Sequence, residues 1–98
     1  MLSLFFDFWR PRRRPDLHVV LYTRQGCHLC ETAHHVLEEA RRRHGFGLEA
    51  VDVDTSAELA AQYGECVPVV VVNDKVRFRG HVNRFLLQRL LDAPAPPA

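Results

Sequence analysis

The stretch Val19-Val20-Leu21-Tyr22-Thr23-Arg24-Gln25-Gly26-Cys27-His28-Leu29-Cys30 decides the fold of this chain. The segment Leu17 to Tyr22 is rich in Val and Leu and is typical of a buried strand. The sequence then predicts a short turn and an amphipathic helix. A Cys-x-x-Cys motif at such a junction is placed to cycle between dithiol and disulfide. The helix is predicted because apolar residues repeat at helical spacing, namely Leu29, Ala33, Val36, Leu37 and Ala40.

The position of the motif predicts different roles for the two cysteines. Backbone N–H groups at a helix start carry partial positive charge, which favours the thiolate form of Cys27. Cys27 is therefore the expected nucleophile. Cys30, one helical turn further along, is expected to attack a mixed disulfide on Cys27 and to release the bound partner. Both are candidate catalytic residues of a thiol–disulfide oxidoreductase that needs no bound cofactor.

Length and composition restrict the class of protein. The 98 residues, 47% of them hydrophobic, suffice for one domain with a modest core. A formal net charge of +1 gives no reason to expect a nucleic-acid partner. Three cysteines with one close pair do not make a secreted disulfide framework, and no secretory signal with a cleavage site is visible. We therefore expect a cytoplasmic protein in a reducing setting.

The middle of the chain predicts a second strand and a second helix. The first helix is expected to stop at Gly45, because glycine is a usual residue at a helix C-terminus. Apolar residues alternate between Phe46 and Val53, which is typical of a strand. Thr55 and Glu58 have the spacing of a capping box and predict the start of a short helix that ends at Gly64.

The last third predicts a hairpin and a final helix. Val67 to Val72 is a nearly unbroken β-branched run, and Asn73-Asp74 tolerates the left-handed backbone of a tight turn before Lys75 to Arg79. The order β-α-β-α-β-β-α predicts an α/β fold with a four-stranded mixed sheet flanked by helices. The cysteines would lie at the C-terminal end of the first strand, where open α/β sheets place their sites. The apolar positions of the final helix are Val82, Phe85, Leu86, Leu90 and Leu91.

On these residues the chain resembles the thioredoxin superfamily, and within it a small glutaredoxin-like branch with a Cys-His-Leu-Cys turn. The resemblance covers residues 17–91 and rests on the turn from Thr23 to Cys30, on Val67-Pro68 and on Gly80 after the hairpin. It implies a thioredoxin-like fold of the glutaredoxin type and a cis peptide bond before Pro68. It also implies that Pro68 lies beside the cysteines and that the Val67 backbone pairs with an extended substrate, such as glutathione or a peptide.

The chain departs from ordinary glutaredoxins in its motif and in its second glycine region. Their usual motif is Cys-Pro-Tyr-Cys, whereas His28 and Leu29 stand between the cysteines here. A protonated His28 would stabilise the thiolate; the alternative is an exposed residue at the helix start. Arg24 replaces a lysine that contacts the glutathione carboxylate, and the acidic pair that meets the glutathione amino end is absent. The resemblance implies glutathione as a candidate co-substrate and, as substrate-binding residues, Arg24, His28, Leu29, Val67, Pro68 and Gly80.

The two ends of the chain differ from the domain between them. We expect an N-terminal extension over residues 1–16, the domain over residues 17–92 and a disordered Pro/Ala tail over residues 93–98. The apolar start is much shorter than the roughly 20 residues of a membrane-spanning helix. Aromatic residues followed by arginines suit a peripheral contact of residues 1–14 with an anionic membrane. The alternative is that the aromatic side chains pack on the domain while the arginines are solvated.

Two further features bear on the chemistry. Cys66 lies two positions before Pro68 and is either a second disulfide partner or a small packing residue. Cys27 and Cys30 alone do not complete a tetrahedral zinc site, so no metal site is predicted. The sequence thus predicts an oxidoreductase that exchanges disulfides on a protein or a small thiol, with electrons from an external thiol donor. The alternatives are a non-catalytic binding module, itself a candidate for membrane association, and an iron–sulfur cluster carrier.

Overall fold

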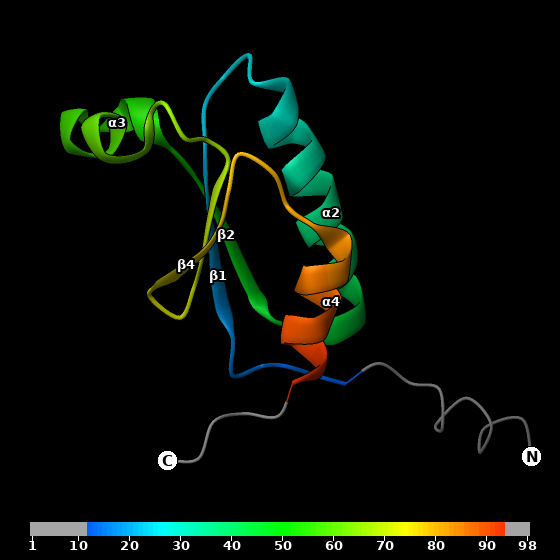
Figure 1. The fold of residues 1–98 in the computed structure, drawn as a ribbon. Helices are drawn as coiled ribbons and strands as arrows, with labels where there is room; N and C mark the ends of the chain where they lie inside the picture. The colour runs from blue at the N-terminus through cyan, green and yellow to red at the C-terminus, as the bar shows by residue number, and fades with distance from the viewer. Residues whose placement is uncertain (1–11, 94–98) are drawn as a thin grey trace, which may run out of the picture.

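The computed structural model describes residues 12–93. It has the predicted order of strands and helices, with one additional 3₁₀ turn (Figure 1). The elements are β1 (His18–Thr23), α2 (His28–His44), β2 (Gly47–Asp52), η1 (Val53–Thr55), α3 (Ala57–Tyr63), β3 (Val69–Val72), β4 (Lys75–Arg79) and α4 (Arg84–Asp92).

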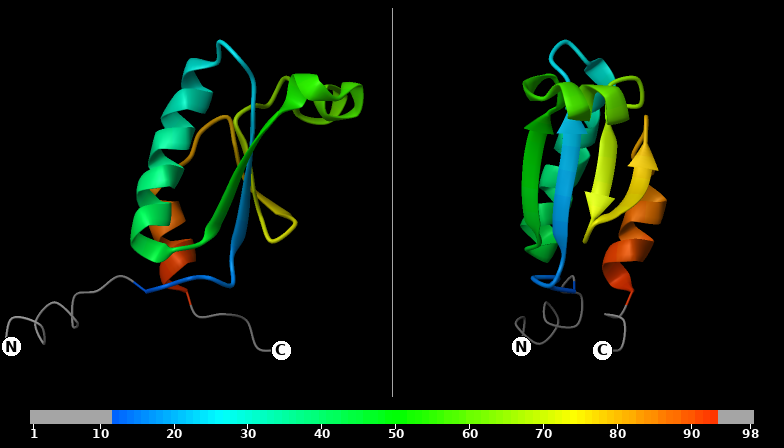
Figure 2. Two further views of the ribbon diagram at one scale, coloured as in Figure 1. Left: turned by 180° about the vertical axis from the view of Figure 1, so that it is seen from behind. Right: turned by 90° about the vertical axis from the view of Figure 1, so that its left-hand side faces the viewer.

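The four strands form one mixed sheet in the order β2-β1-β3-β4, as Figure 2 shows. β1 and β2 are parallel, as expected for a right-handed β-α-β unit, and β3 is antiparallel to both β1 and β4. Asn73 and Asp74 have φ angles of 47° and 69°, which confirms the predicted left-handed hairpin turn. Because Tyr22 pairs with Val69, the end of β1 that leads to Cys27 lies beside the start of β3.

The sheet separates two apolar clusters. α2 and α4 cover one face, where the larger cluster includes Leu21, Leu37 and Leu91. α3 lies on the other face, near the end of the sheet that carries the cysteines (Figure 1). A smaller cluster forms there around Val53, Tyr63 and Val69. Burial of these side chains supplies most of the driving force that holds the helices against the sheet.

α2 carries the cysteines because its two ends are fixed locally. Cys27 is its N-cap residue, and the Cys27 Sγ accepts a hydrogen bond from the Cys30 N–H at 3.2 Å. Gly45 ends the helix in the left-handed conformation with φ 71°, as the sequence predicts. Between these ends Ala33, Val36, Leu37 and Ala40 face the core, which confirms their helical spacing. Leu29, predicted for the same face, is 55% exposed, because Cys30 occupies the core-facing position in the first turn.

Three further details of the sequence prediction are wrong. The cap of α3 is Ser56, whose hydroxyl accepts from the Leu59 N–H at 3.3 Å, because Thr55 belongs to the preceding 3₁₀ turn. β3 begins at Val69, so Val67-Pro68 precedes the strand. In α4 the side chains of Phe85 and Leu86 are 71% and 50% exposed, and Leu87 faces the core instead. The helix begins only at Arg84, and the face that it turns toward the sheet carries Leu87 and Leu91.

Residues 12–16 lie against the ends of α2 and α4. Arg14 is buried, and its guanidinium donates to the backbone carbonyls of Leu90 (3.2 Å), Leu91 (2.9 Å) and Ala93 (2.5 Å) and to both carboxylate oxygens of Asp16. These carbonyls have no partner within the helix, so Arg14 acts as a cap for α4. The remainder of the predicted extension, residues 1–11, and most of the predicted tail, residues 94–98, lie outside the described residues.

Candidate active site

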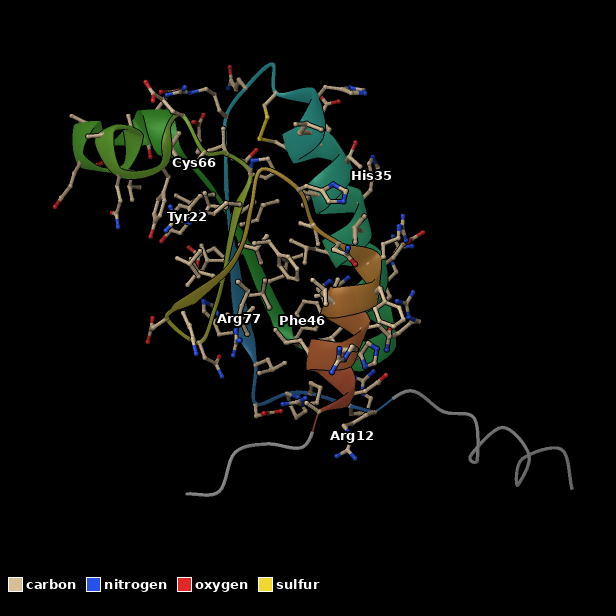
Figure 3. All side chains as sticks on the ribbon, in the orientation of Figure 1. Arg12, Tyr22, His35, Phe46, Cys66 and Arg77 are labelled. Carbon is tan, nitrogen blue, oxygen red and sulfur yellow. A yellow bond between two sulfur atoms is a disulfide. The ribbon has the colours of Figure 1, made fainter. Side chains whose placement is uncertain are left out.

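The Cys-x-x-Cys motif lies where β1 ends and α2 begins. Cys27 and Cys30 are joined by a disulfide, with their Cα atoms 5.2 Å apart (Figure 3). Cys30 is 1% exposed, whereas Cys27 is only partly buried. A partner can therefore approach the sulfur of Cys27 more readily than that of Cys30. This asymmetry agrees with the roles that the sequence predicts for the two residues.

The backbone around Cys27 favours negative charge on its sulfur. Cys27 occupies the N-cap of a helix of 17 residues, where unpaired N–H groups form the positive end of the helix dipole. The Cys30 N–H already points at the Cys27 Sγ. After reduction of the disulfide, the same donors would stabilise a thiolate on Cys27.

Val67 and Pro68 lie beside the end of β1, since Val69 pairs with Tyr22. The Val67-Pro68 peptide bond is cis, which confirms the expectation drawn from the resemblance. The Pro68 carbonyl accepts a hydrogen bond from the Gly80 N–H at 2.8 Å, so two predicted site residues are brought together. Within residues 12–93, no hydrogen bond joins the Val67 backbone to another residue. That backbone is therefore available to an incoming extended chain.

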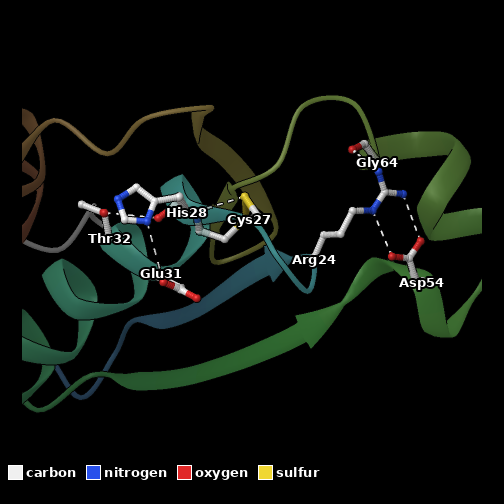
Figure 4. The surroundings of a disulfide bond; sticks show 8 residues. Arg24, Cys27, His28, Glu31, Thr32, Asp54 and Gly64 are labelled. Atoms are coloured by element: carbon white, nitrogen blue, oxygen red, sulfur yellow. Dashed lines mark hydrogen bonds and ion pairs between the residues drawn. A yellow bond between two sulfur atoms is a disulfide. The ribbon is translucent and has the colours of Figure 1, made fainter.

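Arg24 does not point toward the cysteines. Its Nε and Nη2 donate to the two carboxylate oxygens of Asp54 at 2.9 and 3.0 Å, and its Nη1 donates to the Gly64 carbonyl at 2.9 Å (Figure 4). The hydrogen bond with Asp54 raises the pKa of Arg24 above its ordinary value, and the charges of Asp54, Asp52 and Glu65 add to this. The structure thus does not bring the Arg24 guanidinium together with Cys27. Its predicted contact with a substrate anion stays a prediction.

The two residues between the cysteines are exposed to solvent. The His28 side chain is 92% exposed, and its Nδ1 lies 3.9 Å from a carboxylate oxygen of Glu31 (Figure 4). Leu29 is 55% exposed although leucine is apolar. Both side chains can therefore contact a molecule that approaches Cys27.

Cys66 is a free cysteine that packs against the smaller apolar cluster. Its N–H donates to the Tyr63 carbonyl at 2.8 Å. The Tyr63 ring stacks on that of Tyr22 with the ring centroids 4.6 Å apart. These contacts agree with a packing role for Cys66, and its part in disulfide exchange stays a prediction. Among residues 12–93 no group of three or more His, Cys, Asp or Glu side chains is placed to hold a metal ion.

Sequence reasoning missed the partners of Arg24. No local pattern in the sequence links Asp54 to a residue 30 positions earlier. Gly64 was interpreted only as a helix end. A Cβ at Gly64 would lie 2.8 Å from the Arg24 Nη2 and closer still to the Ala60 carbonyl oxygen. A side chain at position 64 would thus clash with the backbone of α3 and displace the Arg24 guanidinium, which only the tertiary fold reveals.

The sheet topology, the Cys-x-x-Cys motif at the β1–α2 junction and the cis-proline before β3 together define a protein of the thioredoxin superfamily. This combination supports a redox function in thiol–disulfide chemistry. The chain belongs to the glutaredoxin-like domain family (DUF836), whose sequence pattern matches residues 18–92. It is also 31% identical over 71 residues to a "Probable Thioredoxin" of Methanothermobacter thermautotrophicus, a match that covers 69% of this chain and 84% of the relative.

Solved structures agree with this membership. The structural genomics target protein XcR50 from X. campestris is 32% identical, with a TM-score of 0.64, over 78% of this chain and 99% of the other. Protein Ne2328 from Nitrosomonas europaea is 29% identical, also with a TM-score of 0.64, over 83% and 92%. A mutant thioredoxin from Halobacterium salinarum is 20% identical with a TM-score of 0.63 over 96% and 88%, and shows likeness of fold alone.

Proposed function

We propose that this protein is a glutaredoxin-like thiol–disulfide oxidoreductase in which Cys27 is the attacking thiolate and Cys30 the resolving thiol. One observation carries the proposal: a partly exposed Cys27 at a helix N-terminus is disulfide-bonded to a buried Cys30 one turn further along. The N–H groups at the N-terminus favour the thiolate, and its exposure permits attack on a bulky substrate. Both features are what a nucleophilic cysteine needs.

The reaction transfers two electrons and proceeds in two exchanges. The Cys27 thiolate attacks one sulfur of a substrate disulfide, so that a mixed disulfide forms and the other substrate sulfur leaves as a thiolate. Cys30, once deprotonated, then attacks the Cys27 Sγ. The Cys27–Cys30 disulfide forms and the second substrate sulfur leaves. An external thiol donor then reduces the Cys27–Cys30 disulfide through two exchanges of the same kind, and the donor leaves as a disulfide.

The substrate is a disulfide in an extended segment of a protein or in a small thiol compound. The unpaired backbone of Val67 supports this proposal, because its N–H and carbonyl would pair with the substrate backbone beside the disulfide. Pro68 and Gly80, linked by a hydrogen bond, would lie beside the bound substrate segment, and the exposed Leu29 would contact apolar substrate side chains.

Glutathione is proposed as a co-substrate that binds with lower affinity than it does to ordinary glutaredoxins. Its carboxylates need a cation near Cys27, and the Arg24 guanidinium is already bound to Asp54 and Gly64. Asp52 and Glu65, whose charges act on Arg24, add negative potential on that side. We therefore expect a neutral or basic protein disulfide to react faster than oxidised glutathione, in the cytoplasmic setting that the sequence favours.

The experiment that tests the function is a measurement of the reduction potential of the Cys27/Cys30 pair. The full chain is equilibrated with glutathione buffers of defined potential, and free thiols are counted by alkylation and mass spectrometry. A reversible two-electron couple between roughly −270 and −120 mV is expected, the span of known oxidoreductases. The variant Cys66→Ser is the control and should leave the potential unchanged. If no reversible bridge forms, the oxidoreductase proposal fails in favour of a binding module.

A further inference from the structure

The charged residues of the described chain are divided between the two ends of the sheet. Near the cysteines, acids gather: Glu31 lies in the first turn of α2, and Asp52 and Glu65 lie close enough to act on Arg24. At the opposite end, α2 finishes in Arg41-Arg42-Arg43. The two ends of α2, 17 residues long, are about 25 Å apart. The net charge of the chain is thus near zero, although the site end is acidic and the opposite end is basic.

The basic end gathers cations from several segments that are distant in sequence. Figure 1 shows the start of the described chain, the end of α2, the end of α4 and the β3–β4 hairpin at this end, and Figure 3 labels Arg12 there. We call this surface the basal surface. Its exposed cations are Arg12, Arg13, Arg42, Arg43, Lys75 and Arg89. Its acids are Asp16, bound to Arg14, Asp92, bound to Gln88, and Asp74.

Among residues 12–93, the basal cations make fewer contacts with carboxylates than four other arginines do. Arg14, Arg24, Arg41 and Arg84 each donate to a carboxylate at 3.1 Å or less. Within residues 12–93, only Arg42 among the basal cations contacts a carboxylate, at 3.9 Å to Glu38. Arg13 approaches the end of α2, where its Nη1 lies 3.5 Å from the Arg43 carbonyl. One helix end offers only about half a negative charge, so it does not account for this number of cations.

A groove with an apolar floor opens at the basal surface between α4 and the hairpin. Its volume is about 570 Å³, and Phe78, Leu86 and Leu90 contribute its apolar lining. Lys75, Arg77 and Arg89 contribute positive charge to its rim. Phe85 on the same helix is exposed as well. Apolar side chains surrounded by cations match the acyl chains and anionic headgroups at the interface of a lipid bilayer.

We propose that the basal surface docks on an anionic lipid bilayer and holds the Cys27 site away from it. Arg12 and Arg13, which belong to the extension for which the sequence predicts a membrane contact, lie on this surface. The acidic site end would be repelled by the same anionic surface, which fixes the orientation. None of the described helices is long and apolar enough to cross a membrane, so the contact is peripheral. This proposal does not depend on the proposed redox function.

The test is co-sedimentation of the full chain with vesicles of phosphatidylcholine alone and of phosphatidylcholine with phosphatidylglycerol. The variant Lys75→Glu/Arg89→Glu changes the basal surface. The single variants Lys75→Glu and Arg79→Glu are the matched pair, because each reverses one charge on the same strand; Arg79 lies at the site end, where it pairs with Val69. We expect binding to the anionic vesicles only, weakened at least about tenfold in the double variant and nearly unchanged in Arg79→Glu. Added salt should weaken the binding, because screening acts on surface charges.

Three outcomes would overturn the proposal. The first is equal sedimentation with both vesicle types, which would mean that apolar residues alone bind. The second is an equal loss in Lys75→Glu and Arg79→Glu, which would mean that net charge rather than the basal surface matters. The third is no vesicle binding at all. Binding of a DNA duplex in that case would mean that the same cations serve a nucleic acid instead. The far-ultraviolet circular dichroism of each variant, measured in parallel, shows whether it is folded.

Discussion

Arg24 and Asp54 form a two-point ion pair that ties the loop before Cys27 to the 3₁₀ turn after β2. The third contact of Arg24, with the Gly64 carbonyl, extends the link to the end of α3. A forked guanidinium can satisfy all these acceptors at once, which a lysine cannot do. Arg24 thus joins the three segments that surround the approach to the cysteines.

Replacement of Arg24 should affect stability more than thiol chemistry. We expect Arg24→Ala to lower the free energy of unfolding slightly, because the pair is partly exposed, and to leave the thiolate titration of Cys27 nearly unchanged. Arg24→Lys should recover little, since the two-point geometry is lost. Urea unfolding and thiolate absorbance measure the two effects. A large shift in the Cys27 titration without loss of stability would instead mean that the charge of Arg24 acts on the thiolate.

The two cysteines should behave differently when replaced one at a time. Cys30→Ser is expected to accumulate a mixed disulfide with a substrate peptide, because no resolving thiol remains. Cys27→Ser should form no such adduct, since Cys30 is 1% exposed and cannot be reached. Mass spectrometry after incubation with an oxidised peptide distinguishes them. An adduct of equal yield on Cys30 in the Cys27→Ser variant would reverse the assignment of roles.

His28 should tune the reduction potential modestly. A positive charge on the imidazole would stabilise the Cys27 thiolate and hence the reduced form, so His28→Ala should lower the potential by on the order of 10–30 mV at low ionic strength. The effect should shrink in 1 M salt, because salt screens an exposed charge. His34→Ala, an exposed histidine further along α2, is the control. An equal shift at low and high salt would point to a steric effect of the side chain rather than its charge.

Arg14 should be the arginine most important for stability. Because its buried guanidinium caps the end of α4, Arg14→Leu should cost about 2–4 kcal/mol of unfolding free energy. The neighbouring Arg13→Leu, at an exposed position, is the matched control and should change the unfolding free energy by less than about 0.5 kcal/mol. Urea unfolding of both variants measures the difference. Equal effects would show that Arg14 is not the cap described above.

The ion pair of Arg14 with Asp16 should make the free energy of unfolding depend on pH in the acidic range. The hydrogen bond from Arg14 lowers the pKa of Asp16 in the folded chain. Its contribution is therefore fully present above the unfolded-state pKa of about 4 and is lost as the pH falls through the lower folded-state value. Asp16→Asn should flatten the fall of unfolding free energy below pH 4 and change its slope little above pH 5. An unchanged acid slope in this variant would mean that Asp16 is equally ionised in both states.

The local part of the fold and the motif were predictable from the sequence. The strand before Cys27, the helix behind it, the glycine at position 45 and the left-handed turn at Asn73-Asp74 follow from short-range rules of spacing and backbone conformation, and all are confirmed. The position of the motif at a helix start, from which the roles of Cys27 and Cys30 are predicted, is confirmed as well. These features depend on neighbours within a few residues, so the sequence by itself determined them.

Only the tertiary structure decided which distant groups meet. It buried Arg14 against the end of α4, although the arginine run suggested solvated side chains. It turned Arg24 toward Asp54, and it left Phe85 and Leu86 exposed although their pattern suggested a core-facing pair. A guanidinium on a long side chain reaches whichever acceptors the packing brings near. A helix likewise buries the face that its neighbours dictate, and neither choice is encoded within a few residues.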